Sequence, residues 1–82
     1  DQVKTQLQES IKVIEQLSSS DFTATRLEEI FRELSIKNDW KFGQFFMMLR
    51  IAITGEKATP PLFDTMTVLG QQLVLSRLKN LT

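Results

Sequence analysis

Cysteine and histidine are both absent from the 82-residue chain. Their absence excludes disulfide bonds and thiolate chemistry, and it removes the residues that most often bind zinc or act as general bases. The longest apolar run, residues 45–49, is far shorter than the roughly 20 residues of a membrane-spanning helix, and the first residues lack a signal-peptide pattern. We therefore expect a cytoplasmic protein that does not enter a membrane.

The sequence also has little that could support catalysis. Three glycines lie too far apart to form a phosphate-binding loop; they are Gly43, Gly55 and Gly70. The carboxylates of residues 28–33 follow one ordinary helix face, and nothing places two of them in an apolar pocket where their pKa values would separate. We expect no catalytic residue, no metal site and no cofactor in this chain.

Apolar side chains recur every three or four residues in the first half of the chain, which is typical of amphipathic helices. The first helix should end at the sequence "SSSD"; its stripe is Val3, Leu7, Ile11, Ile14 and Leu17. A second helix should begin at Thr23 or Thr25, because "TRLE" has the spacing of a capping box, and end within residues 37–39. Its expected buried stripe is Leu27, Ile30, Phe31 and Leu34.

Three more helices are predicted in the second half. Residues 44–54 are apolar on nearly every side, as expected of a helix surrounded by its neighbours. Gly55 fits a left-handed cap of that helix, while Thr59 and Pro60 suit the N-cap and first position of the next. The inward residues of the last two helices should be Leu62, Phe63, Met66 and Leu69, then Leu73, Val74, Leu78 and Leu81. Between the second and third helices, Trp40 and Phe42 are predicted to be core anchors.

These patterns predict one all-α domain over residues 1–82, a compact bundle of about five short helices. No alternating run of strand length occurs. A chain of this size is near the lower limit at which a single core stabilises a domain. It begins "DQVK", without an initiator methionine, and we expect it to be a piece of a longer protein.

Arg50 is the only charged residue within residues 45–53. Two interpretations are open: the guanidinium is buried and paired with Asp64 or Glu56, or it reaches outward to an anion or a base edge. The planar guanidinium suits both hydrogen bonding to bases and stacking on them. A helix N-terminus at Thr59 would offer free backbone N–H groups close by. Arg50 and this helix end could form two walls of one small pocket.

The segment "KFGQFFMMLRIAITGEKATPPLFDTMTVLGQQLVLSRL" resembles the C-terminal end of bacterial-type glutamyl-tRNA synthetases. The matching positions are Lys41, Gly43, Leu49, Arg50, Ala52, Thr54, Gly55, Pro60, Leu62, Phe63, Leu69, Gly70, Arg77 and Leu78. The chain departs from the family pattern at Met48, where a proline is frequent, and at Gln71 and Gln72, which replace a lysine and a glutamate.

The resemblance implies the distal anticodon-binding subdomain, an all-helical cage that contacts the anticodon loop of glutamate tRNA. Its partners would be this tRNA and the remaining domains of the same synthetase. No "HIGH"-like or "KMSKS"-like motif occurs in the chain, so glutamate, ATP and magnesium would bind elsewhere in the parent enzyme. This piece would recognise RNA without catalysing a reaction.

Residue by residue, the resemblance places Arg50 at an arginine that contacts an anticodon base and Leu62 at a leucine packed against the same region. Thr59 and Pro60 would contribute contacts from the intervening loop. Possible phosphate contacts are Lys41, Lys57 and Arg77.

Two alternatives remain at the level of sequence. One is the anticodon-binding region of class I lysyl-tRNA synthetase, which is similar in its helical architecture. The other is a helical protein-interaction module, in which the third helix docks a partner helix and Arg50 is paired internally.

Overall fold

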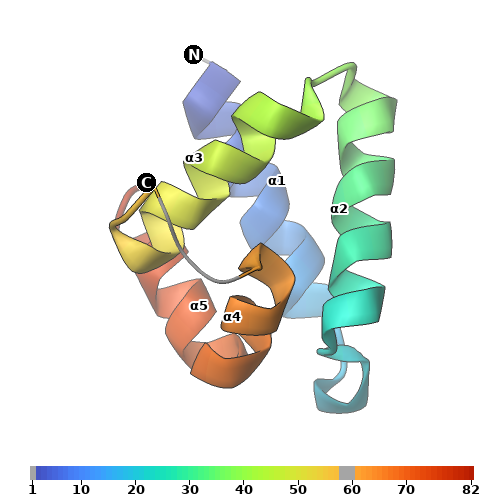
Figure 1. Ribbon diagram of the computed structural model, residues 1–82, viewed down its shortest axis with the longest axis vertical. Helices are drawn as coiled ribbons and strands as arrows, with labels where there is room; N and C mark the ends of the chain where they lie inside the picture. Colours follow the sequence, from blue (N-terminus) through green and yellow to red (C-terminus); the bar gives the residue numbers. More distant parts are fainter. Residues whose placement is uncertain (1, 58–60) are drawn as a thin grey trace.

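The computed structural model describes residues 2–57 and 61–82, which form five α-helices and one short 3-10 helix (Figure 1). These elements are α1 (Gln2–Gln16), η1 (Ser19–Asp21), α2 (Ala24–Asn38), α3 (Phe42–Thr54), α4 (Leu62–Leu69) and α5 (Gln71–Lys79). The described residues contain no strand, so the prediction of an all-α bundle of about five helices is confirmed.

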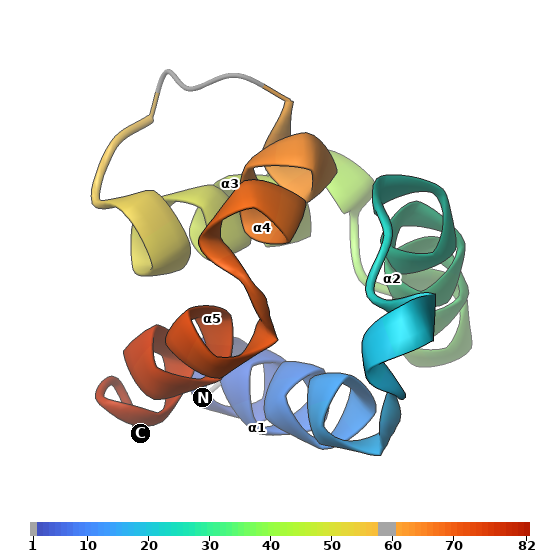
Figure 2. The same ribbon diagram turned by 90° about the horizontal axis from the view of Figure 1, so that it is seen from below.

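The helices surround one interior (Figure 2). Helix α1 packs against α5, α2 against α4, and α3 against both α4 and α5. The interior is filled by the apolar stripes of all five helices, and its largest fully buried side chains are Phe31, Phe45, Ile14, Leu27, Leu49, Ile53, Met66 and Leu78. Five of these, Ile14, Leu27, Phe31, Met66 and Leu78, were predicted from the spacing of apolar residues, because a helix repeats every 3.6 residues and presents such a stripe to one side.

Aromatic rings connect α2, α3 and α4 in the centre of the core. The centroid of the Phe31 ring lies 6.0 Å from that of Phe45 and 5.9 Å from that of Phe63. Trp40, in the turn between α2 and α3, packs on Phe45 with centroids 5.0 Å apart. The prediction that Trp40 is a core anchor is confirmed. The same prediction for Phe42 is wrong, because this ring is 36% exposed.

Helix α2 begins after Thr23, the first of the two predicted starts and two residues before the one that the capping-box spacing suggests. The N-cap is Thr23, whose side-chain oxygen accepts a hydrogen bond from the backbone N–H of Arg26 at 3.3 Å. Thr25 lies inside the helix, so the predicted capping box in "TRLE" does not form. Glu28 instead pairs with Arg32, one turn further on, at 2.9 Å.

The two ends of the segment that joins α3 to α4 differ in how well they were predicted. Gly55 caps α3 in the left-handed conformation, with φ of 79°, as predicted. The predicted start of α4 at Thr59 and Pro60 lies outside the described residues. The described helix begins at Leu62, and Pro61 is its N-cap.

The corner between α4 and α5 consists of a single residue. Gly70 has φ of 91° and ψ of 153°, a combination that is essentially restricted to glycine. This sharp corner turns α5 back onto α1. There the side-chain Nε2 of Gln71 donates to the backbone carbonyls of Ile14 and Leu17, at 2.8 and 3.0 Å. Ile14 lies in the last turn of α1, and its carbonyl also accepts from the backbone N–H of Leu17 at 3.2 Å; Leu17 directly follows the helix. Gln71 thus supplies further donors to carbonyls at a helix end, where intrahelical donors run out.

Several apolar residues that were predicted to be buried are exposed. One face of α3 is open, with Met47 37% and Ile51 41% exposed, so the expectation that neighbours surround this helix is wrong within the described residues. Leu73 and Leu81 on the last segment are 39% and 56% exposed. Residues at these positions follow the helical spacing, but the five helices are too few to cover every apolar face.

We predict that Gln71→Ala lowers the free energy of unfolding by about 1–3 kcal/mol, since the carbonyls of Ile14 and Leu17 each lose a hydrogen bond. Gln72→Ala is the matched control, because the neighbouring glutamine is exposed and its loss should change stability by less than about 0.5 kcal/mol. Urea unfolding followed by circular dichroism measures both. Equal effects of the two substitutions would contradict the capping role.

Candidate functional site

Three side chains of α3 follow one another at intervals of four residues: Phe42, Phe46 and Arg50. Such neighbours on a helix have Cβ atoms about 5–6 Å apart, so the three form a continuous row. Lys41, the N-cap residue, precedes the row, and Lys57 follows the end of the helix. We call these five residues the α3 strip.

Helix α2 adds a second guanidinium to the α3 strip. The Cζ atom of Arg32 lies 5.1 Å from the ring centroid of Phe42 and 5.9 Å from that of Phe46. The two rings are nearly parallel, with centroids 5.8 Å apart and an interplanar angle of 11°. A guanidinium over aromatic faces is a cation–π contact, and Arg32 is held there by its ion pair with Glu28.

Sequence reasoning missed Arg32 and placed Phe42 in the core. No local signal could have joined them, because ten positions separate the two residues and their proximity depends on how α2 and α3 cross. The spacing of Phe42, Phe46 and Arg50 is visible in the sequence, however, and could have indicated a shared face.

Arg50 is half-buried in the second half of α3, a strongly apolar helix. The residue has an interaction partner within the protein. The turn that follows is fixed by Thr54, whose hydroxyl donates to the Arg50 carbonyl at 2.6 Å and accepts from the Glu56 N–H at 3.1 Å. Arg50 is thus held on the strip by a well-defined helix end.

The start of α4 borders the strip through Phe63, whose ring meets that of Phe46 edge-on at 5.3 Å. The neighbouring Leu62 is only 4% exposed, so its side chain belongs to the core and any ligand would meet its backbone. Asp64 in the first turn is exposed and adds negative charge at a helix end that otherwise attracts anions. This helix end is therefore better suited to a neutral polar group than to a phosphate. Thr59 and Pro60, the other predicted contacts here, lie outside the described residues.

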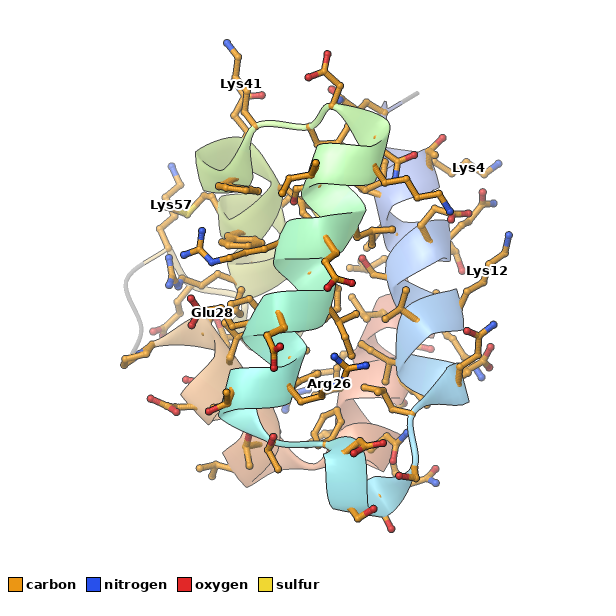
Figure 3. All side chains as sticks on the ribbon, turned by 90° about the vertical axis from the view of Figure 1, so that its right-hand side faces the viewer. Lys4, Lys12, Arg26, Glu28, Lys41 and Lys57 are labelled. Carbon is orange, nitrogen blue, oxygen red and sulfur yellow. The ribbon has the colours of Figure 1, made fainter. Side chains whose placement is uncertain are left out.

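The lysines at the two ends of the strip are exposed and extend away from the body of the protein on the α3 side (Figure 3). Neither Lys41 nor Lys57 forms an ion pair with another described residue. Lys4 and Lys12 extend on the opposite side of the view, from α1. Two unpaired ammonium groups thus flank the aromatic and guanidinium groups of α3.

Arg77 on α5 has a different role from these lysines. Its Nη1 donates to the backbone carbonyl of Ile53 in the last turn of α3, and the residue is half-buried. A cation at this position compensates the unpaired carbonyls and the negative end of the helix dipole. Arg77 therefore holds α5 against the end of α3, and its guanidinium is already engaged within the protein.

Metal sites and membrane spans were the two remaining possibilities for the described residues. Within residues 2–57 and 61–82, no three His, Cys, Asp or Glu side chains gather as a metal site requires. None of the helices in this part of the chain has the length and apolar character that crossing a membrane demands.

Comparison with known proteins identifies relatives of this amino-acid sequence. Residues 1–82 match the family described as the anticodon binding domain. A glutamate–tRNA ligase of Dehalococcoides mccartyi is 48% identical over 58 residues, which cover 71% of this chain and 12% of that protein. Glutamate–tRNA ligases of Solibacter usitatus and Methylacidiphilum infernorum are each 40% identical, over 83% and 95% of this chain and 14% and 17% of those proteins. No solved structure matches the chain.

The chain thus spans between 12% and 17% of the length of these relatives. The matches confirm the resemblance to glutamyl-tRNA synthetases that the sequence motifs indicate.

We predict that Arg77→Met lowers the free energy of unfolding by about 1–2 kcal/mol, because the Ile53 carbonyl loses a charged donor while the apolar stem is retained. The control is Lys79→Met on the same helix, whose exposed ion pair with Glu15 should contribute less than about 1 kcal/mol. Thermal unfolding of both variants measures the difference. A larger loss for Lys79→Met would contradict the structural role of Arg77.

Proposed function

Since the chain belongs to the anticodon binding domain family, we propose that it binds the anticodon loop of glutamate tRNA as one part of a longer glutamate–tRNA ligase. The names of the relatives support the choice of tRNA. The observation that carries the proposal is the α3 strip, which combines the groups that recognise unstacked nucleotides.

Each group of the strip has a counterpart in an anticodon loop. Bases that leave the helical stack are bound by aromatic faces and by arginine planes, which Phe42, Phe46 and Arg50 supply. The negative phosphates between them attract lysines without regard to sequence, and Lys41 and Lys57 lie at the two ends of the row. Arg32 over the two rings adds a further cation on the same face.

Within this interface we assign base recognition to Arg50. Its fork of donors can bind a base edge through two hydrogen bonds at once. Backbone groups at the start of α4, from Leu62 onward, and the residues Thr59 and Pro60 would form the opposite wall. We assign Arg77 no phosphate contact, because its guanidinium is used to cap α3.

We propose further that this chain recognises tRNA and catalyses no step itself. Amino-acid activation would take place in other parts of the longer protein, where glutamate, ATP and magnesium bind. The proposed location is the cytoplasm, where tRNA is charged. Lysine tRNA is not favoured as the partner, because the relatives described above are named for glutamate.

We expect Arg50→Ala to weaken binding of glutamate tRNA by about 1–3 kcal/mol, or roughly 5- to 150-fold, through loss of a bidentate contact. Arg50→Lys should recover little of this, because a lysine keeps the charge but not the planar fork. The measurement is tRNA binding by fluorescence anisotropy with the longer protein that contains this chain.

Arg26→Ala is the control for this experiment, because Arg26 is an exposed arginine of α2 (Figure 3) that lies outside the strip. The affinity of the Arg26→Ala variant for glutamate tRNA should stay within a factor of about two of that of the unaltered protein. If Arg50→Ala is folded, as judged by circular dichroism, and binds with unchanged affinity, Arg50 does not recognise the anticodon.

The salt dependence of the affinity for tRNA tests whether the lysines of the strip contact phosphates. Each phosphate contact to a single strand adds about 0.7 to the slope of log affinity against log salt concentration, so Lys57→Ala should lower the magnitude of that slope by about this amount. Lys4→Ala is the matched control, as an exposed lysine on the other side of the protein. Identical slopes for both variants would show that Lys57 makes no phosphate contact.

A further inference from the structure

An apolar groove of about 780 Å³ lies along the face of α3 that the strip leaves free. Its walls are the first two turns of α1, with Val3 and Leu7, the α3 residues around Met47 and Ile51, and Leu81 near the end of the chain. No charged residue lines it. Four of these side chains are between 37% and 56% exposed.

The groove has the properties of an interface with another apolar surface. Exposed apolar residues are ordinary when scattered, but a contiguous patch of large ones marks a site of association. RNA is a poor occupant, because the groove has no cation to meet a phosphate. Met47 is flexible and polarisable, and methionines of this kind adapt to the shape of a helix laid against them.

We propose that this groove is covered by an apolar helix from the polypeptide that precedes Gln2 in the longer protein. The relatives are between about six and eight times as long as the segment they share with this chain, which makes up 12–17% of them. The resemblance places the shared segment at their C-terminal end, so the additional length would precede it.

The position of the first turn of α1 favours this occupant over any other. Val3, in the first turn of α1, forms part of the groove wall together with residues of α3, and α1 and α3 are in contact. A segment attached there is held next to the groove at a high effective concentration and needs no long linker to reach it. Interfaces between domains of one chain commonly bury 600–1,500 Å², and an adjoining helix laid along α3 and α1 would add to such an interface.

Docking in the groove is compatible with tRNA binding by the strip. Successive residues of a helix are about 100° apart, so Phe46 and Ile51, five residues apart, point in directions about 140° apart. One face of α3 would contact the preceding domain while the other stays open to RNA. The proposal depends on family membership and not on tRNA binding, so failure of one leaves the other intact.

The experiment compares the reactivity of two new thiols in the full-length protein, Ile51→Cys in the groove and Leu73→Cys outside it. The matched exposures of these positions, 41% and 39%, make Leu73 a suitable control. A covered site reacts only during local opening, so we expect alkylation of Ile51→Cys to be at least about tenfold slower. Mass spectrometry of the modified peptides separates these thiols from any others in the full-length protein. Equal rates would overturn the proposal.

A photo-crosslinking experiment identifies the occupant. A benzophenone-bearing amino acid replaces Met47 in the full-length protein, and the crosslinked peptides are sequenced. Crosslinks to residues of the same polypeptide before Gln2 support the proposal. Crosslinks to a second copy, or slow alkylation only when tRNA is present, would contradict it, because a different molecule would then cover the groove.

Discussion

The arrangement of the candidate site depends on the burial of the Phe31 and Phe45 rings between α2 and α3. Each of these buried rings is followed directly by a residue of the candidate site, Arg32 after Phe31 and Phe46 after Phe45. Because neighbours on a helix point about 100° apart, burying the first residue brings the second to the edge of the contact. Arg32 and Phe46 therefore meet at 5.9 Å as a consequence of core packing. Phe63 contacts both Phe31 and Phe46, which fixes α4 against the same edge.

Much of the fold could be predicted because its determinants are local. The apolar stripe with Leu7 and Ile14 and the glycine after α3 are sequence signals that act within one or two turns. The sequence was a poor guide where two neighbouring residues could each cap a helix, or where segments far apart in the chain determine a contact. Thr23 and Thr25 can both cap a helix, and the structure uses the first. The bond from Gln71 to the end of α1 joins positions 54 and 57 residues apart, and no local pattern indicates it.

The candidate site was predicted only in part, because some of its residues stand out in the local sequence while the surroundings of others depend on the fold. Arg50 is conspicuous as a charge in an apolar segment, so the sequence alone singled it out. The role of Leu62 came from the resemblance, and the structure shows that its side chain is buried and that only its backbone is available there. Arg77 illustrates the opposite case: a basic residue in the right segment, whose guanidinium is committed to the end of α3. Composition identifies cations, whereas only the fold distinguishes those that are already used.

Helix α3 is apolar all round because it has three separate environments to satisfy. One face fills the core with Phe45 and Leu49, a second carries the aromatic groups of the strip, and a third lines the groove with Ile51. A domain of zero net charge has little long-range attraction for RNA, so its contribution to affinity must come from short-range contacts that are correctly oriented. Rigid attachment to a preceding domain would supply this orientation, because it removes the rotational freedom that a tethered domain loses on binding. The open apolar face and the α3 strip, as the proposed contact with RNA, are then two requirements of the same helix.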